Sequence, residues 1–204
     1  MAEENISEQK NKGWTASGEP FLTDAVNKCV EKFKDFVSPY PNHAKEATLV
    51  VKKEKITDVL NFLKTEESLK FDYLSDLTAV HFPESEFKIV VVYHLFSTER
   101  KDSLRIKVEL KEGETIPSVV SIWPAANWME REAYDLMGVR FENHPNLKRI
   151  LLPDDWEGHP LRKEYPLGGP QEEMIRSNKY GKPFLLPDDL EEARKIIEEG
   201  KNEK

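Results

Sequence analysis

The chain has 204 residues, of which 38% are hydrophobic and 33% charged, and its formal net charge is -8. This composition permits a packed core beneath a heavily charged surface, and the negative charge excludes a binder of nucleic acid or of an anionic membrane, which needs a cationic footprint. The longest apolar stretch, residues 89–96, falls far short of a membrane span, and the polar start lacks a signal-peptide core, so we expect a soluble cytosolic chain.

A single cysteine, Cys29, limits the redox and metal chemistry of the chain. One thiol cannot form an intrachain disulfide, and it cannot supply the sets of cysteines that hold iron–sulfur clusters or structural zinc. Cys29 lies on an apolar helical pattern, so we expect it to pack as a small hydrophobic side chain.

Two amphipathic helices are predicted in the N-terminal third of the chain. Residues 1–20 are polar and carry no hydrophobic period, so we expect them to be disordered. Thr23 is a suitable N-cap for the first helix, which Pro39 and Pro41 end, and a strand at residues 46–52 precedes the second helix. The apolar residues at helical spacing are Val26, Cys29, Val30, Phe33, Phe36 and Val37 in the first helix and Ile56, Val59, Leu60 and Leu63 in the second.

Three further strands are predicted at about residues 70–82, 86–97 and 103–110, joined by short polar loops that favour an antiparallel meander. In the last strand Leu104, Ile106, Val108 and Leu110 alternate with charged residues. The strand at 46–52 is expected to join this sheet, and the two helices are expected to cover one face. Residues 21–140 are thus predicted to form an α+β domain of two layers, with a mostly antiparallel sheet of about four strands.

The segment "AANWMEREAYDLMG" is predicted to form a further helix, which Gly138 ends as the residue after the C-cap. Met129, Ala133, Leu136 and Met137 form the expected inward stripe. Arg131 and Asp135 are spaced as neighbours on the other side, beside Trp128 and Glu132. Tryptophan among charges is typical of a protein–protein interface. Two histidines within the predicted strands, His81 and His94, are expected to be hydrogen-bonded sheet residues.

Residues 141–204 are predicted to be an extended tail that wraps a partner protein, with a short charged helix near residues 188–199. Seven of the thirteen prolines lie there, and regular patterning is weak. Such a segment cannot build its own core, yet its aromatic and aliphatic residues require burial.

The stretch "PDDWEGHPLRKEYP", residues 153–166, could form an active site, a metal site or a docking surface. A metal site would use His144, His159 and either Asp154 or Asp155, but two prolines and a Trp separate the histidines. Acid–base catalysis by Asp154 and His159 lacks a nucleophile motif, and the chain has no phosphate loop or dinucleotide glycine fingerprint. Paired opposite charges, a Trp and rigid prolines favour a preorganised docking surface.

Residues 130–166, "EREAYDLMGVRFENHPNLKRILLPDDWEGHPLRKEYP", resemble the signature of the C-subunit (30-kDa-type) family of proton-pumping NADH:quinone oxidoreductase, respiratory complex I. The stretch "FDYLSDLTAVHFP" also resembles the family's central strand, with His81 where an Asp is common. The resemblance covers roughly residues 22–170. The matching signature residues are Glu130, Arg131, Glu132, Asp135, Gly138, Phe141, His144, Pro145, Arg149, Asp154, Asp155, Trp156, Gly158, His159, Arg162 and Lys163.

The resemblance implies a structural and assembly subunit without a cofactor, a bound metal or catalytic residues of its own. The whole complex is expected to hold FMN and iron–sulfur clusters and to transfer electrons from NADH to quinone, coupled to proton translocation. The chain is expected to dock on the quinone-site protein of the complex, its D-type component, which is related to hydrogenase large subunits, and on other proteins of the peripheral arm. Its expected place is the cytoplasmic side of the bacterial inner membrane, which it reaches only through the complex.

The residues expected to dock on partners are Trp128, Glu130, Arg131, Glu132, Asp135, His144, Arg149, Asp154, Asp155, Trp156, His159, Arg162 and Lys163. Two alternatives stay open. One is the equivalent subunit of a membrane-bound hydrogenase, a ferredoxin:quinone oxidoreductase or a deazaflavin-dependent dehydrogenase. The other is a free-standing metal-dependent hydrolase that uses His144, His159 and nearby carboxylates.

Overall fold

The computed structural model describes residues 23–41 and 46–165. The disorder predicted for residues 1–20, the last part of the predicted tail and its helix near 188–199 lie outside the described residues. The elements in chain order are α1 Asp24–Phe33, the 3-10 turn η1 Lys34–Phe36, β1 Val37–Pro39, β2 Thr48–Val51, the 3-10 turn η2 Lys53–Lys55, α2 Ile56–Thr65, β3 Tyr73–His81, β4 Ile89–Ser97, β5 Asp102–Leu110, β6 Thr115–Pro117, α3 Ala126–Met137 and β7 Arg140–Glu142.

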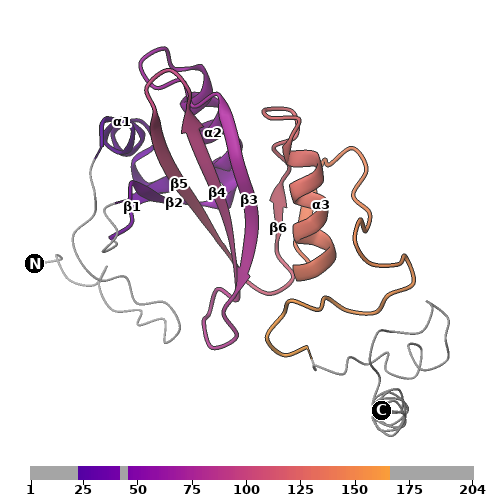
Figure 1. The fold of residues 1–204 in the computed structure, drawn as a ribbon. Helices are drawn as coiled ribbons and strands as arrows, with labels where there is room; N and C mark the ends of the chain where they lie inside the picture. The colour runs from indigo at the N-terminus through magenta and orange to yellow at the C-terminus, as the bar shows by residue number, and fades with distance from the viewer. Residues whose placement is uncertain (1–22, 42–45, 166–204) are drawn as a thin grey trace, which may run out of the picture. The chain divides into compact units, whose positions relative to one another are not determined.

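The main sheet has five strands in the order β1-β2-β5-β4-β3, with β3 at one edge (Figure 1). Strands β3, β4 and β5 form the predicted antiparallel meander. Strand β2 joins the sheet as expected, pairing in parallel with β5, and β1 pairs antiparallel with β2. The predicted α+β class and mostly antiparallel sheet are confirmed, with one strand more than expected.

Helices α1 and α2 pack against one face of this sheet, where their apolar stripes meet those of the strands. The four apolar residues predicted for α2 are fully buried, as are Val26 and Cys29 of α1. The hydroxyl of Thr23 accepts a hydrogen bond from the backbone N–H of Val26 at 3.4 Å, so the predicted N-cap is confirmed.

The first helix ends earlier than predicted, at Phe33. Lys34 has a positive φ of 44°, which a right-handed helix does not allow, so the helix stops there, and Phe36 is exposed. Val37 then begins strand β1 and pairs with Val51 of β2. The physical reason is that β2 offers an open edge, and a β-branched residue fits a paired strand better than a helix end.

Helix α3 lies beside the edge strand β3, and the two-stranded parallel pair β6–β7 flanks it (Figure 1). Its inward residues share one continuous core with Ile116, Val119, Trp123 and Phe141. Gly138 ends the helix with φ of 78°, as predicted. The compact unit continues to Tyr165, beyond the boundary expected at residue 140, because β7 pairs with β6 and the following residues bind α3.

Within the described part of the chain, no helix combines the length and apolar character required to cross a membrane.

Candidate functional site

The signature residues gather around α3, but not in the arrangement that the sequence predicted. Asp135, which was expected on the outer side of the helix, is fully buried, and so is Glu130. Asp135 pairs with Arg149 and not with Arg131, its neighbour on the helix. The two carboxylates are therefore held inside the chain, each by a separate set of contacts.

Asp135 is buried because the chain returns over the outer face of α3. At about 100° per residue, Asp135 lies within about 20° of the exposed Trp128, on the side away from the core. Its Oδ2 accepts backbone N–H bonds from Ile150, Leu151 and Leu152 at 3.0, 2.8 and 2.9 Å. We call residues 148–165, which cover this face, the strap.

The carboxylate of Asp135 is held in its charged form. Burial pushes its pKa upward, but the three N–H donors of the strap and the Arg149 guanidinium together lower the pKa below its ordinary value. The guanidinium of Arg149 lies 2.6 Å from Oδ1 of Asp135. Asp135 is therefore the point at which the helix fixes the strap.

Three arginines tie the strap to the helix through backbone carbonyls. Arg131 donates to the carbonyls of residues 148 and 149 at 3.1 and 2.9 Å. Arg149 donates to the carbonyls of residues 135, 156 and 158 at 2.8 to 3.1 Å. Arg162 donates to the carbonyl of Met137 at 2.9 Å and pairs with Glu112 at 2.7 Å. The cations predicted to dock on a partner thus make contacts within the chain.

His159 closes the strap over the end of the helix. Its Nδ1–H donates to the carbonyl of Asp135 at 2.8 Å, and burial lowers its pKa. The ring lies so near Gly138 that a Cβ there would stand 2.6 Å from Cδ2 of His159. Glycine is required at this position both for the positive φ and for this close approach.

Glu130 belongs to a second cluster, in which its own side chain is fully buried. Ser118 donates its hydroxyl to Oε2 at 2.6 Å, and the N–H of Val119 donates to Oε1 at 2.7 Å. Burial raises the pKa of Glu130 to about 7, although these two donors lower it in part. Nε2 of His144 lies 3.9 Å from the carboxylate, and the field of Glu130 adds to the burial that raises the pKa of Tyr93. This cluster holds the connection between β6 and α3.

The strap and α3 leave three large apolar side chains exposed: Trp128 and Leu151, each at 61%, and Leu161 at 57%. The guanidinium of Arg131 lies 5.4 Å from the centre of the Trp128 ring. Trp128 is among the residues expected to dock on a partner, whereas Leu151 and Leu161 are not. The signal that could have found them is their position as aliphatic residues within the densely polar signature.

The other predicted docking residues lie as follows. Glu132, Asp154, Asp155 and Lys163 are exposed, and His144 and Trp156 are partly buried. The indole N–H of Trp156 is buried and finds no acceptor among the described residues. Nδ1 of His144 accepts the N–H of Asn146 at 3.0 Å, and its Nε2 faces the carbonyl of Asn127 at 3.3 Å.

The ligand set of the hydrolase alternative does not come together within residues 23–41 and 46–165. Those residues contain one group that could hold a metal, namely His81, Glu112 and Glu164, with ligand atoms within 4.8 Å of one another. Arg162 pairs with Glu112 there, and Nδ1 of His81 accepts the N–H of Lys163 at 3.0 Å. An arginine and a backbone donor thus occupy the positions that a cation would need.

The strand histidines differ from the expectation in one respect. His81 is hydrogen-bonded through Nδ1, but its buried Nε2 has no partner among the described residues. Burial lowers the pKa of both His81 and His94.

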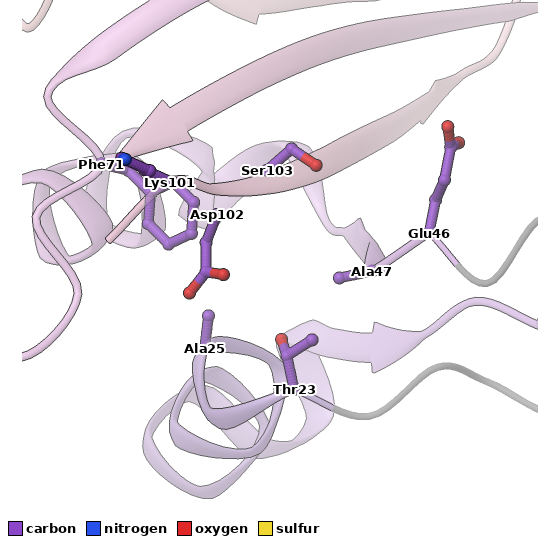
Figure 2. Close-up of a pocket in the computed structure, with 8 residues that line it drawn as sticks. All are labelled: Thr23, Ala25, Glu46, Ala47, Phe71, Lys101, Asp102 and Ser103. Carbon is purple, nitrogen blue, oxygen red and sulfur yellow. The ribbon is translucent and has the colours of Figure 1, made fainter. Parts of the chain in front are cut away.

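A pocket of about 200 Å³ lies between the start of α1 and the start of β5 (Figure 2). Thr23, Glu46, Phe71 and Asp102 are among the residues that line it. Thr23 and Glu46 each follow a stretch of chain that the structure does not describe, and we assign the pocket no function.

Comparison with known proteins identifies the group to which this architecture belongs. Residues 49–171 match the family described as "Respiratory-chain NADH dehydrogenase, 30 Kd subunit". The C subunit of the NADH-quinone oxidoreductase of Geotalea uraniireducens is 49% identical over 153 residues, covering 74% of this chain and 92% of that protein. The C subunit of the Geobacter metallireducens enzyme is 50% identical over 154 residues, covering 74% of this chain and 94% of that protein.

A solved structure agrees. A chain in the structure of the membrane-bound sulfane sulfur reductase, described as an archaeal respiratory membrane complex, matches with a TM-score of 0.60. The identity is 26%, and the match covers 78% of this chain and 91% of that one. These matches confirm the resemblance carried by residues 130–166, and the chain belongs to the 30-kDa subunit family of respiratory-chain NADH dehydrogenase.

Proposed function

We propose that this chain is a structural and assembly subunit of the peripheral arm of an NADH:quinone oxidoreductase. The observation that carries the proposal is the close match to a protein named as the C subunit of that enzyme, 92% of whose length is covered. The complex transfers electrons from NADH to quinone and couples this to proton translocation. FMN and the iron–sulfur clusters then reside on other subunits.

The chemistry of the described residues supports a role without a cofactor. Cys29 is fully buried, and burial raises the pKa of its thiol to about 12, so it is a poor thiolate ligand. The polar signature residues Asp135, Arg149 and His159 are engaged in holding the strap. In this proposal these residues hold the strap in place on α3 and take no part in electron transfer.

In this proposal the chain docks through α3 and the strap on the quinone-site protein of the complex, the hydrogenase-like D-type component, on the cytoplasmic side of the inner membrane. The supporting feature is the exposed side chain of Trp128. Tryptophan is enriched at protein interfaces, where its ring contributes a large apolar contact area.

The experiment is native purification of the tagged chain from a mild-detergent membrane extract, with mass spectrometry and iron analysis. A large iron-rich assembly with an NADH-oxidising module and a quinone-site subunit is the expected result. The double variant Trp156→Ala, Arg162→Ala is expected to lower its yield. A chain that elutes alone near 23.7 kDa without iron contradicts the proposal.

A second candidate is the equivalent subunit of a related respiratory complex with another electron-input module, such as a membrane-bound hydrogenase or a ferredoxin:quinone oxidoreductase. It is favoured by the match to a chain of the archaeal sulfane sulfur reductase complex. The same purification separates the two, because the input subunits that accompany the chain differ. A hydrogenase or ferredoxin-linked module would keep the structural role and change the enzyme.

A further inference from the structure

The strap gives α3 a new outer surface. Without it, the side of the helix that bears Asp135 would face solvent. With it, the N–H of Leu151 is bound to Oδ2 of Asp135, and the N–H of Leu161 is bound to the carbonyl of Leu136. Both leucines therefore lie against the C-terminal half of α3, while their side chains are exposed. Arg131 joins this region to Trp128, because it contacts the indole ring and the carbonyls of the strap.

On this surface more carboxylates than cations are exposed. The arginines of α3 and the strap are only partly exposed, because they bind backbone carbonyls or a carboxylate of the chain. The exposed lysines are Lys148 and Lys163. The exposed carboxylates are Glu132, Asp154, Asp155, Glu157 and Glu164. The exposed charged side chains are thus two lysines and five carboxylates, of which Glu164 also lies in ion pairs with His81 and Arg162. The exposed charge is therefore mainly acidic, although the sequence of the strap contains four residues of each sign.

From these two observations we propose that α3 and the strap form a docking face with an apolar centre and an acidic rim. The centre is Trp128, Leu151 and Leu161, and the rim includes Asp154 and Glu157. The partner that fits is a protein surface with apolar side chains flanked by Lys and Arg, because opposite charges at an interface rim favour the correct partner and speed its binding. This inference rests on the proposed function, since it requires that the chain works within an assembly.

The test uses the full tagged chain in its native membranes, with the fraction of the chain in the large assembly as the readout. Leu151→Ser with Leu161→Ser is expected to lower that fraction roughly tenfold or more, as loss of a central contact does. Phe36→Ser is the matched control, because Phe36 is also an exposed apolar residue but lies in η1, the turn that follows α1. Unchanged melting temperatures of the purified variants would show that the fold is retained.

A second pair of variants tests the sign of the charge. Asp154→Lys with Glu157→Lys is expected to lower the assembled fraction and to reduce its sensitivity to salt. Glu31→Lys with Asp35→Lys changes the net charge equally on exposed residues near α1 and is expected to have no effect. A photo-crosslinking residue at Leu151 is expected to capture a partner peptide that contains Lys or Arg beside apolar residues.

The outcomes separate this inference from the proposed function. A wild-type chain found alone would overturn both. A wild-type chain in the assembly, with the leucine and charge variants no different from their controls, would overturn the docking face and leave the proposed function standing. Capture of an acidic partner peptide at Leu151 would overturn the charge complementarity.

Discussion

The carboxylate of Glu130 makes the stability of the chain depend on pH. Its pKa is ordinarily 4.5, and burial raises it to about 7, so the folded state holds the proton more tightly than the unfolded state. Its contribution is therefore fully present below pH 4.5 and is lost as the pH rises through 7. Glu130→Gln has no proton to lose, and relative to wild type it is expected to gain on the order of 3 kcal/mol between these limits. Urea unfolding from pH 4.5 to 8 measures the difference, with the exposed Glu132→Gln as control. A Glu130→Gln curve parallel to wild type would contradict this.

Asp135 makes stability depend on pH in the opposite direction. Its pKa is lowered overall, so its stabilising contribution is lost as the pH falls. Asp135→Asn removes the charge opposite Arg149 and turns an amide group toward N–H donors. We expect a loss of roughly 3 kcal/mol and faster hydrogen exchange at Ile150, Leu151 and Leu152. Asp58→Asn, in an exposed pair with Lys55 at 2.8 Å, is expected to cost about 1 kcal/mol at most. Hydrogen exchange of the native protein, measured by NMR or mass spectrometry, tests this expectation. Strap amides that stay protected in Asp135→Asn would show that Asp135 does not hold the strap.

The burial of these two carboxylates could be predicted from the sequence only in part. The helical projection placed Asp135 away from the core, and the structure agrees. The strap that buries it returns from residues 148–165, and no helical period reports on such a contact. Glu130 lies within about 20° of Met137 on the same projection, so its inward position could have been read from the pattern. A buried carboxylate needs partners, and these come from Ser118 and Val119 in the loop before α3, whose positions no helical period predicts.

At the level of elements, the end of α3 depends on a glycine for two separate reasons. Gly138 and Gly113 have nearly the same φ, 78° and 76°. A Cβ at Gly113 would meet nothing within 4 Å, whereas one at Gly138 would meet His159 and Arg162. Gly113→Ala is therefore expected to cost roughly 1–2 kcal/mol from backbone strain alone. Gly138→Ala is expected to cost roughly a further 1–3 kcal/mol because hydrogen bonds of His159 and Arg162 are displaced. Chemical unfolding of both variants measures the gap, and equal losses would show that the strap does not rest on the helix end.

Helices α1 and α2 and the meander were predictable because their hydrophobic periods are local and run over several residues. Strands β1, β6 and β7 have three residues each and depend on partners elsewhere in the chain, so no period marks them. The parallel pairing of β2 with β5 likewise joins segments more than fifty residues apart, Leu49 with Ile106. The strap is the extreme case, because its contacts with α3 are mostly polar contacts to backbone groups, which leave no hydrophobic pattern in the sequence.

At the scale of the whole molecule, these contacts decide where the folded domain ends. A chain ending at residue 165 keeps β7, the strap and every described partner of Asp135, so its thermal midpoint is expected to stay close to that of the full chain. A chain ending at residue 140 loses the buried Phe141, which alone is worth roughly 3 kcal/mol or more, and it loses most of the pairing of β7 with β6. Its midpoint is expected to fall by more than about 10 °C, since about 1 kcal/mol shifts the midpoint of a domain of this size by a few degrees. Circular dichroism of the three chains measures this. Equal midpoints for the two truncated chains would show that the folded domain ends at residue 140. The strap would then add nothing to the stability of the isolated chain.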